Sequence, residues 1–103
     1  MEMFTVNLEV GISSSKFDEV LTTAVEGGIN YWCDGVIARD DGSYRLKVDG
    51  DWHTLNVNVV RRGLGLLASS YPYQFMEVVD GVYDSEAADM AVQLGLFEDV
   101  IYG

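Results

Sequence analysis

The chain has 103 residues, of which 49% are hydrophobic and 22% charged, and its 17 acids and six bases give a formal net charge of −11. This length and composition are typical of one folded unit, so we expect a single domain over 1–103. The sequence has no apolar run long enough to span a membrane, and its first ten residues lack the basic start of a signal peptide. A single cysteine excludes an internal disulfide, which fits a reducing cytoplasm.

The acids are distributed unevenly along the chain. Residues 1–62 contain ten acids and all six bases, whereas 63–103 contain seven acids and no Lys, Arg or His. This charge disfavours direct binding to nucleic acid or to an anionic membrane, because both need Lys and Arg. It favours a basic partner, such as a protein that itself binds nucleic acid. The alternative is that the acids only keep the protein soluble.

The first predicted elements are a strand and a helix. Phe4–Val10 alternates and is rich in β-branched and aromatic residues, which predicts a strand. Apolar residues at helical spacing over 17–25 predict a helix, capped by one of the serines that precede it. Gly27-Gly28 is expected to end this helix, since glycine accepts the left-handed conformation of a helix C-terminus.

The middle of the chain, Tyr31 to Val57, is predicted to form a three-stranded antiparallel meander. Asp41-Gly42 suits a type I′ turn, and Gly50-Asp51 suits a type II′ turn. Two such turns fix the pairing register of the strands. The register pairs Leu46 with Ile37 and Leu55, and it predicts a buried face of Ile37, Tyr44, Leu46, Val48, Leu55 and Val57 and a solvent face of Arg45, Lys47, Thr54 and Asn56.

Helices are predicted for the rest of the chain. Small residues on the inward side of the last helix predict close helix packing, and the apolar tail Val100-Ile101-Tyr102 is expected to dock, for example as a short strand. The fold is therefore expected to be α+β, a three- to four-stranded antiparallel sheet with three helices packed on one face. The expected ranges are 59–68 after a cap at Asn58, a short helix Pro72–Val79 ended by Gly81, and a helix from Asp84 or Ser85 to Phe97.

The sequence contains no residue set typical of an active site or a metal centre. His53 could in principle join Cys33 and Asp51 in catalysis, but the register places Cys33 on the buried face, as a small hydrophobic residue. The Asp-Gly segments at 40–42 and 49–51 resemble fragments of a calcium loop, yet they lack its terminal bidentate Glu. We therefore expect no enzyme, no catalytic residue, no metal and no cofactor.

Two groups of residues are candidate binding sites. Glu26, Asn30, Tyr31 and Trp32 stand at a helix–strand junction and could line a small-molecule pocket, or could form a helix end followed by core aromatics. The second group is the acids, which could imitate the phosphates of duplex DNA or form an ordinary solvated face. Its predicted partner-binding members are Glu77, Asp80, Asp84, Glu86, Asp89, Glu98 and Asp99, followed by the loop acids Asp40, Asp41, Asp49 and Asp51.

Two segments of the chain resemble a family of small proteins encoded by bacteriophages, chiefly of actinobacteria. The segments are Leu21–Cys33 (LTTAVEGGINYWC) and Asp84–Gly103 (DSEAADMAVQLGLFEDVIYG), and Arg61–Leu64 is similar to a helix start of that family. The family has no established activity. Glu98-Asp99 departs from its pattern, because relatives tend to have one glycine and one acid there. The resemblance implies a phage protein that acts in the cytoplasm of its bacterial host.

A phage context favours an inhibitor of a host defence system. The most concrete expectation is an anti-CRISPR protein that acts as an acidic DNA mimic and blocks DNA or PAM binding by a CRISPR effector. Its partner would be a basic nucleic-acid-binding protein, without direct contact to nucleic acid or membrane. The alternatives are a nucleotide-binding phage accessory protein that uses the Glu26–Trp32 pocket, and a structural virion protein that packs with itself.

Overall fold

The computed structural model of the protein describes residues 11–81 and 85–103. The predicted strand Phe4–Val10 and the predicted cap Asp84 lie outside these ranges. The first half of the described chain contains the helix α1 (Ser14–Thr23), the π-helical turn η1 (Ala24–Gly28) and the strands β1 (Gly35–Ala38), β2 (Tyr44–Val48) and β3 (Asp51–Leu55). The second half contains the helices α2 (Val57–Ser70), α3 (Pro72–Asp80) and α4 (Ser85–Phe97).

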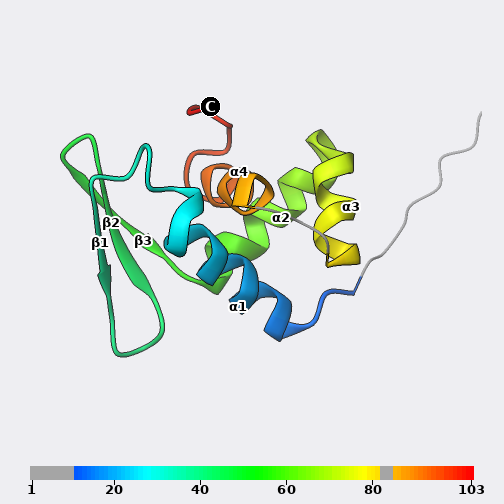
Figure 1. Ribbon diagram of the computed structural model, residues 1–103, viewed down its shortest axis with the longest axis horizontal. Coiled ribbons are helices and arrows are strands. Elements are labelled where there is room, and N and C mark those ends of the chain that lie inside the picture. The colour runs from blue at the N-terminus through cyan, green and yellow to red at the C-terminus, as the bar shows by residue number, and fades with distance from the viewer. Residues whose placement is uncertain (1–10, 82–84) are drawn as a thin grey trace, which may run out of the picture.

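The three strands form one antiparallel sheet in the order β1-β2-β3, which confirms the α+β class and the meander. Figure 1 shows this sheet at one end of the molecule, with the helices gathered beside it instead of spread over one of its faces. The most extensive contact between elements joins α2 and α4. In the described ranges, every helix is too short or too polar to cross a membrane.

The register between β1 and β2 differs from the predicted one by one residue. Val36 lies opposite Leu46, where Ile37 was predicted. The type I′ turn is absent because the Asp41 side chain accepts a hydrogen bond from the Ser43 backbone N–H at 2.9 Å, which stabilises a longer loop. A shift of one residue reverses the faces of a strand, and Ile37 is accordingly 52% exposed.

The register between β2 and β3 differs from the predicted one by two residues. The turn residues are Asp49 and Gly50, with φ angles of 50° and 87°, so the turn has the positive φ angles of type I′ and lies one residue earlier than predicted. Leu46 consequently lies opposite His53. A shift of two residues keeps every side chain on its face, so Leu46 and Leu55 are both buried as predicted.

Helix α2 begins earlier than predicted. Val57 is its first residue and is 38% exposed, so its predicted place on the buried face of a strand is wrong. The cap is Asn56, whose side-chain oxygen accepts a hydrogen bond from the Val59 backbone N–H at 3.1 Å, and not Asn58. The predicted inward stripe is confirmed, since its members are buried: Val60, Leu64 and Leu67.

Helix α1 ends for a different reason than the predicted one. The Ile29 backbone N–H donates to the Ala24 carbonyl at 3.1 Å, which closes a π turn, and neither Gly27 nor Gly28 has a positive φ. An added Cβ on Gly28 would stand 2.8 Å from a backbone oxygen of α4, so this glycine permits a close approach. Helix α3, in contrast, ends as predicted, at a left-handed Gly81.

Helices α2 and α4 cross at two glycines. An added Cβ on Gly63 would stand 1.8 Å from the Ala91 carbonyl oxygen, and one on Gly95 would stand 2.1 Å from the Val59 carbonyl oxygen. Any side chain at these positions would occupy space taken by the backbone of the other helix. The predicted close packing of the last helix is therefore confirmed. Arg62 Nε donates to the Gly95 carbonyl at 2.9 Å beside this crossing.

Candidate functional site

Asp89 lies at the centre of a buried polar network. The residue is 5% exposed. Its carboxyl group accepts hydrogen bonds from Tyr31 Oη at 2.5 Å, Trp32 Nε1 at 2.7 Å and Gln93 Nε2 at 2.9 Å. Three donors satisfy a carboxyl group that has left water. The prediction that Asp89 belongs to an outward acidic face is therefore wrong, because this residue holds the segment after η1 against α4.

The Gln93 side chain extends this network to the C-terminal tail. Gln93 is fully buried, and its Oε1 accepts hydrogen bonds from the backbone N–H groups of Ile101 and Tyr102, both at 2.8 Å. The Tyr102 ring stacks on the Trp32 ring, with centroids 5.3 Å apart and planes 5° from parallel. The tail docks on the core as predicted, but as an irregular segment and not as a strand.

Two tyrosines bring acids from distant parts of the chain together. Tyr31 Oη also donates to the Tyr102 carbonyl at 3.2 Å, and Tyr102 Oη donates to Asp49 of the β2–β3 turn at 2.9 Å. The charge of Asp34 contributes to the raised pKa of the Tyr102 phenol. The charge of Glu86 contributes in the same way to the raised pKa of the Tyr31 phenol. We name Tyr31, Asp34, Asp49, Glu86 and Tyr102 the acidic tyrosine surface.

The phenol groups of this surface are in a negative electrostatic environment. The pKa of Tyr31 is raised from 10.0 to about 12, first because burial of the hydroxyl disfavours the phenolate, and then because of the hydrogen bond and charge of Asp89. Tyr31 as a whole is 59% exposed, although its hydroxyl donates to the buried Asp89. The hydrogen bond to Asp49 is the main reason for the raised pKa of Tyr102. A surface of this sign attracts cations.

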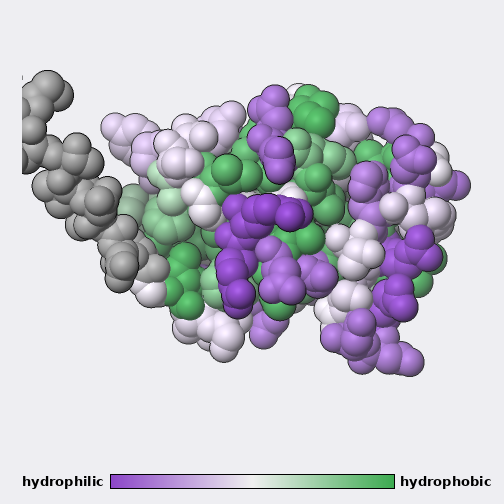
Figure 2. Space-filling model, turned by 180° about the vertical axis from the view of Figure 1, so that it is seen from behind, coloured by the Kyte–Doolittle hydropathy of each residue, from purple (hydrophilic) through white to green (hydrophobic). Residues whose placement is uncertain are grey.

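The other predicted partner-binding acids do not form one face. Asp40 and Asp41 lie at the β1–β2 turn, at the opposite end of the sheet from Asp49. Asp41 instead borders the same hollow as Asp18 of α1, an acid that sequence reasoning did not include in the site. Figure 2 shows hydrophilic side chains across the middle of one face and over the sheet end, with hydrophobic atoms between them. The remaining exposed acids of the predicted set are Asp51 on β3, Glu77 and Asp80 on α3, and Glu98 and Asp99 after α4.

The cations of the protein lie mostly against neutral groups. Lys16 and Glu19 form an ion pair at 3.6 Å. Contacts with rings and with a carbonyl do not neutralise an acid. Four of the six bases make such contacts: Arg45 and Lys47 lie 5.1 Å and 6.0 Å from the Trp52 ring centroid, Arg61 lies 5.7 Å from that of Phe17, and Arg62 donates to Gly95.

The predicted pocket at Glu26–Trp32 is formed only in part. Trp32 is 6% exposed and belongs to the core, so its predicted place in a pocket wall is wrong. Tyr31 lines a hollow of about 550 Å³ between η1, α4 and the tail, whereas Glu26 and Asn30 are exposed outside it. Glu86 also lines this hollow and would repel the phosphates of a nucleotide.

His53 and Cys33 take part in packing. The His53 ring meets the Phe97 ring edge to face, with centroids 5.5 Å apart. The Cys33 thiol donates to the Gly35 carbonyl at 3.2 Å, and burial raises the pKa of this thiol. Within residues 11–81 and 85–103, no three His, Cys, Asp or Glu side chains are placed to hold a metal ion.

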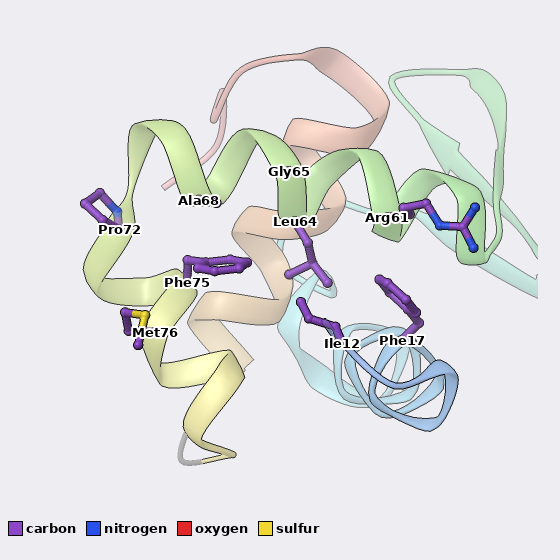
Figure 3. Close-up of a pocket in the computed structure, with 9 residues that line it drawn as sticks. All are labelled: Ile12, Phe17, Arg61, Leu64, Gly65, Ala68, Pro72, Phe75 and Met76. Carbon is purple, nitrogen blue, oxygen red and sulfur yellow. The ribbon is translucent and has the colours of Figure 1, made fainter. Parts of the chain in front are cut away.

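An apolar hollow of about 480 Å³ lies between α1, α2 and α3. Figure 3 shows its walls, formed by Ile12 and Phe17 on one side and Phe75 and Met76 on the other, with Leu64 between them. We name this hollow the apolar groove. Sequence reasoning missed it, because helical periodicity indicates which residues turn inward but not where neighbouring helices leave space.

Comparison with known proteins finds no match for the chain among family models, curated proteins or solved structures.

Proposed function

We propose that the protein is a binding protein, not an enzyme, and that its acidic tyrosine surface docks on a basic, nucleic-acid-binding surface of a partner protein. The observation that carries this proposal is that Tyr31 hydrogen-bonds to Tyr102 and Tyr102 to Asp49, with Glu86 lining the same hollow as both tyrosines. The charge of Asp34 adds to the raised pKa of Tyr102. Tyrosine is enriched at protein interfaces because it joins an apolar ring to a polar tip. The three carboxylates offer charge partners for Lys and Arg side chains.

The surface is organised before a partner arrives. The hydroxyls of Tyr31 and Tyr102 are held by Asp89 and Asp49, and the tail is held by Gln93. Binding therefore costs little ordering of these side chains. The net charge of −11 adds long-range attraction to a basic partner, which predicts fast and salt-sensitive association.

The phage-family resemblance supports a narrower form of the proposal. In this form the protein is an inhibitor of host defence in the bacterial cytoplasm, and most concretely an anti-CRISPR protein. Its carboxylates would bind the Lys and Arg side chains with which a CRISPR effector holds DNA or reads the PAM. They would thereby replace the DNA phosphates at those side chains.

The test measures DNA binding by guide-loaded CRISPR effectors in the presence of the protein. The first variant, Asp34→Asn/Asp49→Asn/Glu86→Gln, removes three charges from the acidic tyrosine surface. The matched control removes three charges elsewhere: Asp18→Asn/Glu77→Gln/Asp80→Asn. The wild type and the control should inhibit DNA binding, and the first variant should inhibit about tenfold more weakly, because exposed ion pairs contribute roughly 0.2–1 kcal/mol each.

Three outcomes would contradict parts of this proposal. Absence of inhibition across effectors, together with absence of binding to them, would refute the anti-CRISPR form. Equal inhibition by both variants would refute the assignment to the acidic tyrosine surface. A large homo-oligomer in size-exclusion chromatography would favour a structural virion protein.

A further inference from the structure

The apolar groove has the size and lining of a small-molecule site. Its volume of about 480 Å³ falls within the roughly 300–1,000 Å³ typical of ligand pockets. In Figure 3 the side chains of Phe75 and Leu64 point toward each other across the groove, and the Phe17 ring closes one end. The groove is built by α1, α2 and α3, and it shares no lining residue with the acidic tyrosine surface.

Arg61 gives this groove a defined charge. Among the described residues that line the groove, it is the one that carries a charge, and Figure 3 shows it at the rim. Its guanidinium carbon lies 5.7 Å from the centroid of the Phe17 ring. The chain has 17 acids and six bases, so an apolar hollow whose charged lining residue is a base contrasts with the rest of the molecule. Charge complementarity therefore selects an anion.

We propose that the apolar groove binds an amphipathic anion, a ligand with an apolar body and one anionic head. The body would lie between Phe17, Leu64 and Phe75, where its burial supplies the free energy of binding. The head would lie at the rim beside the Arg61 guanidinium, which suits carboxylate geometry. This site goes beyond the proposed function, since it uses other residues and another class of ligand.

The first test compares octanoate, octanol and octyltrimethylammonium, which have alkyl chains of seven or eight carbons and heads that are anionic, neutral and cationic. Amide chemical shifts in NMR titrations report the affinity and locate the probe. Octanoate should bind most tightly and should shift resonances of α1, α2 and α3. Arg61→Gln should weaken octanoate binding about two- to fivefold and leave octanol binding unchanged. Equal affinity for all three probes, or tighter binding of the cation, would overturn the proposal.

The second test fills the groove. Gly65 lines it, and an added Cβ at this position meets no atom within 4 Å. Gly65→Leu should therefore fold and lower octanoate affinity more than tenfold. The matched control is Ser69→Leu, which adds the same side chain at an exposed position of α2. Ala68→Leu blocks the groove from a second position and tests the proposal if Gly65→Leu does not fold.

Two further results would overturn the inference. Equal octanoate affinity in the wild type and in both groove-filling variants would place the probe elsewhere. If octanoate bound only after removal of residues 1–10, the groove would be assigned to that segment of the chain and not to a free anion.

Discussion

Asp89 illustrates how much the role of an acid depends on its surroundings. Its carboxyl group collects donors from Tyr31, Trp32 and Gln93, whereas the neighbouring acid on α4, Glu86, is exposed. Hydrogen bonds to a charged group contribute about 1.5–3 kcal/mol each, and buried donors that lose their acceptor carry a further cost. Asp89 is thus a structural residue within an acidic chain.

We predict that Asp89→Ala lowers the free energy of unfolding by about 3 kcal/mol, because it leaves the buried Trp32 Nε1 donor without its acceptor. Urea denaturation followed by circular dichroism measures this change. The control is Asp80→Ala, which removes an exposed acid at the C-terminal end of α3 and should change stability by less than about 0.5 kcal/mol. A loss below about 1 kcal/mol for Asp89→Ala would contradict this role.

The Tyr31 hydroxyl should make stability sensitive to alkaline pH. Its pKa is about 12 in the folded protein, above the ordinary value of 10.0 expected after unfolding. The folded state therefore favours the neutral phenol, so this contribution to stability is complete below pH 10 and is lost as pH rises toward 12. Absorbance titration of the wild type against Tyr31→Phe isolates the phenol. Asp89→Asn should lower this pKa in part, because burial of the hydroxyl remains, and an unchanged value would contradict the contribution assigned to Asp89.

At the scale of elements, the crossing of α2 and α4 determines which glycines are replaceable. Gly63 and Gly65 stand two residues apart in the same helix, but only Gly63 faces the backbone of α4. An added Cβ at Gly63 would overlap the Ala91 carbonyl, whereas one at Gly65 meets open space. A substitution at Gly65 therefore tests helix propensity alone, whereas a substitution at Gly63 also tests the packing of α2 against α4.

Gly65→Ala should raise the free energy of unfolding by about 1 kcal/mol, because alanine has a higher helix propensity than glycine by about this amount. Gly63→Ala should lower it by about 3 kcal/mol or more, because the two helices must move apart. Chemical denaturation of both variants under one condition provides the measurement. A stabilising effect of Gly63→Ala would show that the crossing is looser than described.

The sequence predicts elements better than it predicts their contacts. The periodicity of Val60, Leu64 and Leu67 indicates a helix and its inward stripe, and both are found. The predicted β1–β2 register was wrong because Asp41 is suited equally to a position in a two-residue turn and to a side-chain hydrogen bond that lengthens the loop. Asn56 and Asn58 are chemically identical caps, and only the place where β3 ends distinguishes them.

At the scale of the whole molecule, the acid excess opposes folding. A net charge of −11 on 103 residues produces self-repulsion in the compact state. Among the described residues, four bases contact rings or a carbonyl, and contacts of this kind do not offset the repulsion between acids. The free energy of unfolding should therefore depend on ionic strength.

Raising NaCl from 0.1 M to 1 M shortens the Debye length from about 10 Å to about 3 Å. The midpoint of thermal unfolding should rise by about 5 °C, which corresponds to roughly 1 kcal/mol for a domain of this size. Differential scanning calorimetry measures the shift. The variant Asp34→Asn/Asp49→Asn/Glu86→Gln should show a smaller rise in this midpoint. A rise equal to that of the wild type would show that the salt effect does not arise from the acidic tyrosine surface.

The sequence indicates some residues of the candidate site, but it does not indicate which of them lie next to one another in the folded chain. The sequence singles out Asp49 and Glu86 as partner-binding acids and Tyr31 as a pocket residue. It also includes Asp89 among those acids, and it omits Asp34 and Tyr102. Only the folded chain brings the β2–β3 turn next to the C-terminal tail, through the hydrogen bond from Tyr102 to Asp49. Spacing along one helix carries no information about such neighbours.

The two tryptophans give the molecule two built-in fluorescence probes that differ in exposure. Trp32 is 6% exposed and stacks on Tyr102, whereas Trp52 is 43% exposed on the sheet between Arg45 and Lys47. Iodide, an anionic quencher, is drawn to the two cations and should extinguish Trp52 emission while Trp32 stays bright. Two variants that each keep one tryptophan would then follow the sheet and the helical core separately, each in its own titration.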